Sequence, residues 1–401
     1  MLLASSSFIR ICLLASTRRK TGRAPCQPCL QPTYGMCYPL HAFSHGLFSL
    51  PAMLSLSLLS VFVFGARSVQ SAMARIPLTK LTPSEMIASD NTTMAGGINV
   101  PVSNYSLVYY ATIFIGTPPQ PFRLLLDTGS ADLLVVSKYC NRCDNFGVPG
   151  EGYNPNASAT YQPSGLPIKV RFGAGNVEGF TVIDTVALDQ NMSVMGQMFI
   201  DVNASALSFD LELDGILGLG LPALSVDQIP TVFENAIAQN LVHDPVFALY
   251  LSDNAPELTW GGYDPTKFHG QLAFVPGNLA AYPFWAIALD KVAVGNHGIH
   301  LRKKKKSNRD KKSIIPALID CTVGFIYGPT KQVAAIAKLA NANLITFNSS
   351  KAEFWLFPQS EVRHLPDIVF TIGGIDYPLS WESLSSCQQK WCFLHIIGQN
   401  M

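Results

Sequence analysis

A single aspartate, Asp127, interrupts an apolar run at residues 124–134, where the chain reads Leu-Leu-Leu-Asp-Thr-Gly-Ser-Ala-Asp-Leu-Leu. The residues before it are typical of a buried strand, and the Thr-Gly-Ser that follows is typical of a tight turn. A carboxylate in such a place can move a proton in acid–base catalysis if a suitable partner faces it. The structural alternative is an aspartate that only accepts hydrogen bonds from the amides of its own turn.

The elements that must position Asp127 are short strands. Four segments rich in Leu, aromatic and β-branched residues are bounded by Gly or Pro: 109–116, 122–127, 131–137 and 166–172. Residues 170–186 predict a hairpin with a Gly-rich turn, long enough to project from a sheet and cover a cleft. Helical spacing of apolar residues follows Pro230 and Pro329. The sequence therefore predicts a mostly β protein.

Size and charge restrict the class of protein. The 401 residues suffice for two ordinary hydrophobic cores, and an apolar content of 48% supports a folded body. A formal net charge of +1 gives no field for attracting nucleic acid, so we expect no nucleic-acid partner. Acidic residues are missing before Glu85, while basic residues crowd the start (Arg10, Arg18, Arg19, Lys20 and Arg23). This asymmetry indicates a targeting region.

Residues 53–74 fit a secretory signal peptide, with an apolar stretch from Met53 and the small-x-small sequence Ala72-Met73-Ala74 at its end. Residues 1–52 are then an upstream targeting segment or sequence that does not belong to the natural protein. Two alternatives stay open. In one, residues 46–66 form an uncleaved membrane anchor, which is the one case that places the protein on a membrane. In the other, the Arg- and Ser-rich start is a mitochondrial presequence.

Sequons and cysteines agree with a secreted protein or one of the secretory or vacuolar pathway. Asn-x-Ser/Thr sequons, candidates for glycosylation, follow the signal at Asn91, Asn104, Asn156, Asn191, Asn203 and Asn348. Cys140 and Cys143 predict a small disulfide loop in an oxidising compartment. A zinc or redox site is the lesser alternative, because no second Cys or His pair stands at ligand spacing.

The order of motifs over residues 75–401 resembles the pepsin-like aspartic endopeptidases. The motifs are NYSLVYYATIFIGTPPQPFRLLLDTGSADLLVVS at 104–137, the Gly-rich hairpin, DGILGLG at 214–220, GGYD at 261–264 and LPDIVFTIGG at 365–374. The resemblance implies a bilobal β fold in which each lobe supplies one Asp loop. A hairpin flap closes over an extended peptide in the shared cleft.

The resemblance also divides the chain. ARIPLTKL at 74–81 looks like the start of an inhibitory propeptide, which we place at 75–100. The first catalytic lobe with its flap would then span 101–252 and the second lobe 253–401. A basic run at 301–312 interrupts the second lobe. We interpret it as a solvated loop insertion; the alternatives are a processing site and a nuclear signal, which would contradict secretion.

Carried onto this sequence, the resemblance makes Asp127 the first catalytic carboxylate and Asp320, in ALIDCTVGFIYGP at 317–329, the second. Two such carboxylates share one proton because they cannot both ionise cheaply at short range. The ionised one takes a proton from water, and the protonated one assists the scissile carbonyl. The nucleophile is then water, so no metal or organic cofactor is implied. The expected partners are protein or peptide substrates of a monomer.

The supporting residues follow from the same resemblance. Thr128 and Gly129 complete the first loop, and Ser130 is the hydroxyl that supports Asp127. The flap tip is Phe172, Gly173, Ala174 and Gly175, with Phe172 where the family usually has Tyr. In the flap, apolar packing on the substrate is retained but the phenol's hydrogen bond is lost.

The second loop departs from the family pattern. Asp320 is followed by Cys321, Thr322, Val323 and Gly324 where the family reads Thr-Gly-Thr-Ser. We expect Cys321 to be a weaker hydrogen-bonding group than Thr, and Thr322 to add a β-branched side chain where no Cβ was expected. With Val323 in place of the hydroxyl, we expect Asp320 to lack the counterpart of Ser130.

The end of the second lobe departs as well. Ile216-Leu217-Gly218 braces the first loop, and a counterpart at the same spacing after Asp320 would fall past Met401. Ile396-Ile397-Gly398 comes too early to be that brace. We therefore expect an incomplete second lobe with unpaired strand edges and low stability. Gln359 stands where the family's second-lobe Cys is expected, which leaves Cys387 and Cys392 to pair locally or stay free.

Three functional hypotheses follow, in this order. The first is a secreted aspartic endopeptidase whose second loop and last segment are misrepresented in this sequence. The second is a catalytically inactive, pepsin-like pseudoprotease that is secreted and binds peptides. The third is a structural or inhibitory secreted fragment, which no feature beyond the early end supports.

Overall fold

The computed structural model describes residues 2–5, 8–11, 73–80, 108–143, 151–172, 175–207, 213–252, 255–268, 272–277, 282–301, 315–346, 353–388 and 390–399. Several expected features therefore lie outside the described residues. These are most of the signal and propeptide segments, residues 46–66, the flap-tip residues Gly173 and Ala174, and the basic run beyond Leu301. Among the described residues, none of the helices is both long and apolar enough to span a bilayer.

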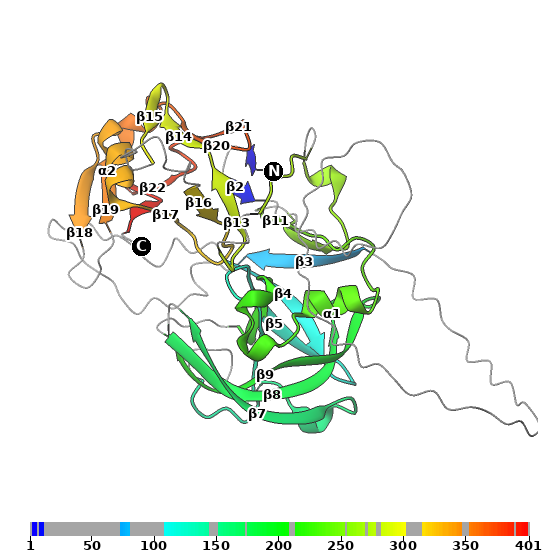
Figure 1. The fold of residues 1–401 in the computed structure, drawn as a ribbon. Helices are drawn as coiled ribbons and strands as arrows, with labels where there is room; N and C mark the ends of the chain where they lie inside the picture. Colours follow the sequence, from blue (N-terminus) through cyan, green and yellow to red (C-terminus); the bar gives the residue numbers. More distant parts are fainter. Residues whose placement is uncertain are drawn as a thin grey trace, which may run out of the picture.

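The first body is built on a ten-stranded sheet (Figure 1). In spatial order its strands are β11 (Phe247–Tyr250), β12 (Glu257–Trp260), β3 (Ala74–Lys80), β4 (Tyr109–Ile115), β5 (Gln120–Asp127), β10 (Gly215–Gly218), β6 (Leu133–Val136), β9 (Ser193–Leu207), β8 (Gly175–Ala187) and β7 (Gln162–Phe172). All four segments predicted as strands are found in this sheet.

Alternation of buried and exposed residues sets the core of this body. On β4, Ala111, Ile113 and Ile115 are buried, and they pack with Leu124 and Leu126 of the antiparallel neighbour β5. Because side chains alternate across a strand, this pattern puts one apolar face inward. Helix α1 (Val232–Ala238) covers the core, and its start has a capping box between Thr231 and Glu234.

The first body extends past residue 252, where we expected it to end. Strand β12 pairs with β11 on one side and with β3 on the other, and Leu258 and Trp260 are fully buried in the first core. The expected boundary therefore falls inside a hairpin of this sheet. Strand β3 starts at Ala74, the last residue of the expected signal, and buries Ala74, Ile76 and Leu78.

The second body consists of smaller sheets around helix α2 (Thr330–Leu339) (Figure 1). A four-stranded sheet has the order β15 (His297–Ile299), β14 (Lys291–Val294), β20 (Ile368–Ile372), β21 (Ile375–Leu379). A six-stranded sheet has the order β17 (Ile326–Gly328), β24 (Ile396–Gly398), β19 (Glu353–Pro358), β23 (Trp391–Leu394), β22 (Ser385–Gln388), with β18 (Asn343–Thr346) beside β19. Strands β13 (Ala286–Leu289) and β16 (Ile315–Leu318) form a pair.

The second body has a core of its own. Val333, Ile336 and Ala337 of α2, predicted as core from their helical spacing, are buried. They lie in one cluster with Phe357 and Trp381, which pack edge to face. Apart from these two bodies, residues Leu2–Ser5 (β1) and Phe8–Ile11 (β2) pair as an antiparallel hairpin.

Candidate active site

The first loop holds Asp127 at the end of β5. The carboxylate is buried and accepts two hydrogen bonds from its own turn. The amide of Gly129 donates to Oδ1 at 2.7 Å, and the hydroxyl of Ser130 donates to Oδ2 at 2.5 Å. Each oxygen therefore has a donor from the turn, and the turn fixes the plane of the carboxylate.

Asp320 from the second body lies beside Asp127. A Cβ built on Gly129 would stand 2.9 Å from Oδ2 of Asp320 and 3.1 Å from Oδ1 of Asp127. Because glycine has no Cβ, both carboxylates can approach the Cα atom of Gly129 closely. Strand β16, which ends at Leu318, and the adjacent Ile319 bring Asp320 to this place.

Hydrogen bonds tie the two loops together across the bodies. The hydroxyl of Thr128 donates to the carbonyl of Ile319 at 3.1 Å and accepts from the amide of Cys321 at 3.0 Å. In the other direction, the thiol of Cys321 donates to the carbonyl of Leu126 at 3.2 Å. Thr128 and Cys321 thus occupy matching positions: each side chain donates to the carbonyl of the residue before the aspartate of the other loop. We call this pair of bonds the clasp; its donor atom is oxygen in Thr128 and sulfur in Cys321.

The family of this chain follows from sequence comparison with known proteins. The model of the eukaryotic aspartyl protease family matches residues 108–401, which include both loops. The chain belongs to this family. It is 33% identical over 312 residues to cathepsin E of Cavia porcellus, covering 76% of this chain and 74% of that protein. It is 35% identical over 286 residues to pepsin F of Oryctolagus cuniculus, covering 70% and 68%.

A further similar protein is pregnancy-associated glycoprotein 2 of Sus scrofa. This chain is 35% identical to it over 285 residues, which cover 70% of this chain and 62% of the glycoprotein. The family match itself, over residues 108–401, extends over both bodies of the fold and not over the first loop alone.

One expectation about the second loop of this aspartyl protease is wrong. Asp320 was expected to lack a supporting hydroxyl, but the side chain of Thr322 provides one. Its Oγ1 donates to Oδ1 of Asp320 at 2.6 Å, and the amide of Thr322 donates to the same oxygen at 2.9 Å. The side chain of Thr322 points back to the carboxylate of its own loop, so the hydroxyl stands one residue earlier than Ser130 does in the first loop.

The brace of the first loop has no counterpart beside Asp320 among the described residues. In the first body, β10 pairs with β5 in parallel, with Gly218 opposite Asp127, and with β6 antiparallel. A Cβ on Gly218 would come within 2.3 Å of the backbone of Ala131, so only glycine permits this approach. Strand β16 pairs with β13 alone in the described part of the chain.

Ile396-Ile397-Gly398 has a different role from the brace. As β24 it pairs in parallel with β17, which follows the Asp320 loop. In the first body, the strand that follows the Asp127 loop is β6, and it pairs in parallel with Ile200–Val202 of β9. The segment 396–398 is therefore the equivalent of residues 200–202 in the middle of β9. This agrees with its rejection as the brace.

Burial determines the electrostatics of the site. Desolvation raises the pKa of Asp127, and the charge of Asp320 raises it further, while the hydrogen bonds from Ser130 and Gly129 act in the opposite direction. Burial also raises the pKa of the Cys321 thiol to about 12, with the charge of Asp127 as the next cause. The thiol therefore stays protonated and keeps its bond to Leu126.

The predicted hairpin is present as β7 and β8. The two strands pair in register up to Phe172 opposite Gly175, on either side of the two tip residues outside the described part. Phe172 is half-buried. It packs against a buried cluster that includes Ile168 and Val170 of the same strand, β7. Its ring is therefore partly held by its own lobe.

The predicted disulfide and sequons lie as follows. Cys140 and Cys143 form a disulfide, and so do Cys387 and Cys392, the local pairing that was one of the two alternatives. Cys321 is a free cysteine. Of the sequons, Asn156 and Asn191 are exposed and Asn203 is half-buried, whereas Asn91, Asn104 and Asn348 lie outside the described residues.

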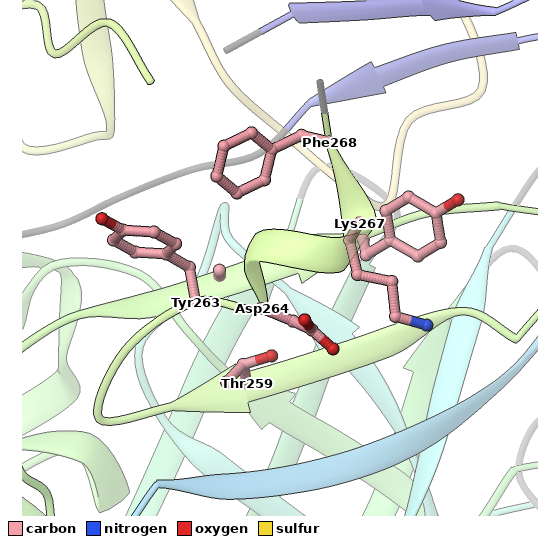
Figure 2. A pocket seen from close by; sticks show the side chains of 7 residues that line it. Thr259, Tyr263, Asp264, Lys267 and Phe268 are labelled. Atoms are coloured by element: carbon pink, nitrogen blue, oxygen red, sulfur yellow. The ribbon is translucent and has the colours of Figure 1, made fainter. Parts of the chain in front are cut away.

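A small hollow lies elsewhere, beside β11 and β12 (Figure 2). Asp264, Lys267 and Phe268 reach it from one short helical turn. The carboxylate of Asp264 is already bound, because Arg75 of β3 pairs with it at 2.6 Å and Thr266 donates to it. The ion pair ties the turn of Asp264 to β3, and neither Asp127 nor Asp320 lines the hollow.

Trp285 is a site residue that the sequence reasoning missed. Its indole Nε1 donates to the carbonyl of Leu219 at 2.8 Å, and its own carbonyl accepts from the amide of Ile319. It thereby connects the brace of the first loop to the residue before Asp320. The only signal in the sequence was that Trp285 stands directly before the residues of β13. No spacing pattern links it to either loop.

Asp201 is a buried carboxylate outside the site, and because of it we expect the fold to be more stable in acid than at neutral pH. Asp201 on β9 receives a hydrogen bond from Ser137 at 3.3 Å on Oδ2, and its buried Oδ1 has no partner among the described residues. Burial raises the pKa of Asp201 to about 7. The folded protein keeps this proton over a range where the unfolded chain loses it, from about pH 4 upward. Stability therefore falls as the pH rises to 7.

Between pH 4 and pH 7.5 we expect the free energy of unfolding to fall by on the order of 3 kcal/mol less in Asp201→Asn than in the wild type. Urea unfolding at several pH values measures this. Asp376→Asn is the control, because Asp376 is an exposed aspartate bonded to Thr371. It should keep the wild-type slope. An unchanged slope in Asp201→Asn would show that Asp201 is ionised in the fold.

Proposed function

We propose that this chain is an aspartic endopeptidase that hydrolyses peptide bonds with a water molecule activated between Asp127 and Asp320. The observation that carries the proposal is the position of both carboxylates around Gly129, with each loop hydrogen-bonded to the other body. Family membership supports the reaction class. The raised pKa of Asp127 supports a pair that holds one proton under acid conditions.

The reaction is written with the pair in this singly protonated state. The ionised carboxylate takes a proton from water as the water oxygen bonds to the scissile carbonyl carbon. The protonated carboxylate gives its proton to the carbonyl oxygen, which produces a neutral diol. The carboxyl group that took the proton from water then gives it to the amide nitrogen. The other carboxylate takes a proton from a diol hydroxyl as the C–N bond breaks, so the pair returns to its singly protonated starting state.

Other residues have supporting roles in the proposal. Thr128 and Cys321 hold the two loops at a fixed distance, Gly129 leaves space between the carboxylates, and Ser130 and Thr322 orient them. The hairpin of β7 and β8, with Phe172, Gly173, Ala174 and Gly175 at its tip, covers the substrate as a flap. An extended peptide would pair along its edge, as strands do when they add to a sheet.

We place the protein in the secretory route, as a secreted or vacuolar enzyme. Two disulfides support an oxidising compartment, and the exposed sequons Asn156 and Asn191 are accessible to glycosylation. Asp127, Asp132 and Asp201 are carboxylates whose pKa is raised by burial, so an acid compartment suits the stability of the fold as well as the reaction.

A second candidate function is a pseudoprotease that binds peptides without cleaving them. The specific observation in its favour is that β16, which leads to Asp320, has β13 as its single partner in the described part of the chain. A carboxylate on a poorly braced strand keeps its position less well, and misplacement by about 1 Å can cost a hundredfold in rate.

One experiment separates the two functions. The full chain, secreted from a eukaryotic host, is incubated with unfolded casein at pH 3–5 and at pH 7.5, and the peptides are identified by mass spectrometry. The endopeptidase produces internal cleavages in acid and few at pH 7.5. A soluble, folded chain that binds peptide but leaves casein intact supports the pseudoprotease and overturns the proposed enzyme.

A further inference from the structure

The two carboxylates of the candidate site are held in different ways. Both oxygens of Asp127 have a donor, Gly129 on Oδ1 and Ser130 on Oδ2. Asp320 has both of its donors on one oxygen, because the amide and the hydroxyl of Thr322 both reach Oδ1, at 2.9 and 2.6 Å. The difference arises from the place of the hydroxyl, which lies three residues after Asp127 but two residues after Asp320.

The second oxygen of Asp320 is thereby turned toward the first loop. Oδ2 is the atom that lies 2.9 Å from the position a Cβ would take on Gly129, and it accepts no hydrogen bond from the described residues. Burial raises the pKa of Asp127 and of Cys321, and the charge of the neighbouring Asp320 raises both further. Two donors on Oδ1 restrict rotation of the carboxylate, and the β-branched threonine has few rotamers of its own.

We propose that Thr322 is a positioning residue for the reaction: its hydroxyl and amide together hold Oδ1 of Asp320, so that Oδ2 is presented to the attacking water beside Asp127. This inference rests on the proposed function and deepens it. Thr322 supplies the hydroxyl that Val323 lacks. The side chain of Val323 is exposed and carries no hydrogen-bond donor at the position that corresponds to Ser130.

The test moves the hydroxyl within the loop. Thr322→Val keeps the shape and removes the donor, Thr322→Ser keeps the donor, and Thr322→Gly removes the side chain. The double variant Thr322→Gly with Val323→Ser copies the Gly129-Ser130 arrangement of the first loop. For each, kcat, KM and the pH profile of kcat/KM are measured on a peptide substrate.

We expect Thr322→Val to lose about 10- to 100-fold in kcat with KM changed less than about threefold, because the substrate is still bound but one carboxylate of the pair is misaligned. The pH profile of kcat/KM should shift as well, because one carboxylate of the pair that shares the proton has lost a donor. Thr322→Ser should stay within about threefold of the wild type. The double variant should recover most of the activity that Thr322→Gly loses.

The control is Thr371→Val. Thr371 donates to Asp376 at 2.6 Å, the same distance as in the Thr322–Asp320 bond, but on an exposed hairpin of the second body. It should leave kcat and the pH profile unchanged. Full activity with an unshifted profile in Thr322→Val would overturn the role of Thr322 while leaving the proposed function intact.

Loss of the proposed function would appear differently, as a wild-type chain that is folded and inert. In that case crystal structures of the wild type and of Thr322→Val decide the positioning role. We expect the Asp320 carboxylate of the variant to rotate so that Oδ2 no longer faces Gly129. An unchanged orientation would refute the proposal in an inactive chain as well.

Discussion

Asp127→Asn is expected to lower the rate of peptide hydrolysis by at least about 10³-fold while leaving the fold intact. The substitution keeps the shape of the side chain and can keep the bond from Ser130, but the amide neither takes nor gives the proton that the pair must move. The measurement is cleavage of unfolded casein at pH 4, with thermal unfolding followed by circular dichroism.

The effect should be specific to the two site carboxylates. Asp320→Asn is expected to give a loss of similar size. Asp244→Asn is the control, since this aspartate of the first body is exposed and its side chain pairs with the ring of His243. It should keep full activity. Substantial residual cleavage in both site variants would mean that the hydrolysis comes from another group or a contaminant.

Gly129→Ala is expected to lower kcat by about 100-fold with a small change in stability. The added methyl group would stand 2.9 Å from Oδ2 of Asp320 and 3.1 Å from Oδ1 of Asp127, so the carboxylates must move apart. A displacement of about 1 Å in a catalytic group costs rate on this scale. The backbone at Gly129 lies outside the left-handed region, so alanine itself is not strained there.

The matched control is Gly298→Ala. Gly298 on β15 also has an ordinary backbone conformation, and a Cβ built on it meets nothing within 4 Å. Both variants should unfold within about 1 kcal/mol of the wild type, and only Gly129→Ala should lose activity. A fully active Gly129→Ala would contradict the positions of the two carboxylates around that residue.

The second loop departs from the family pattern, but Asp320 keeps part of the hydrogen bonding that supports Asp127 in the first loop. Cys321 keeps the clasp to Leu126 because its buried thiol stays protonated, although sulfur is a weaker donor than a hydroxyl. Thr322 keeps a hydroxyl on Asp320. The part that has no replacement in the described residues is the strand beside β16, so the proposed activity depends on how firmly β13 positions β16.

The local pattern was sufficient to predict strands β4 to β8, helices α1 and α2 and the first loop. Apolar runs bounded by Gly or Pro gave β4, β5 and β6, and the Thr231 cap preceded α1 where the spacing indicated it. These features depend on periodicity and turn chemistry, which act over a few residues. The motif order was enough to indicate the family and to pair Asp127 with Asp320.

Only the tertiary structure decided how the second loop is supported. The direction of the Thr322 hydroxyl, the bond of Trp285 to Leu219 and the place of β24 beside β17 are contacts between loops and strands distant in the chain, or rotamers selected by those contacts. The extension of the first sheet to β12 is of the same kind, because β12 is held by β3, far away in the sequence. Sequence spacing carries no record of such contacts, since packing and hydrogen bonding across the two bodies select them after the strands have formed.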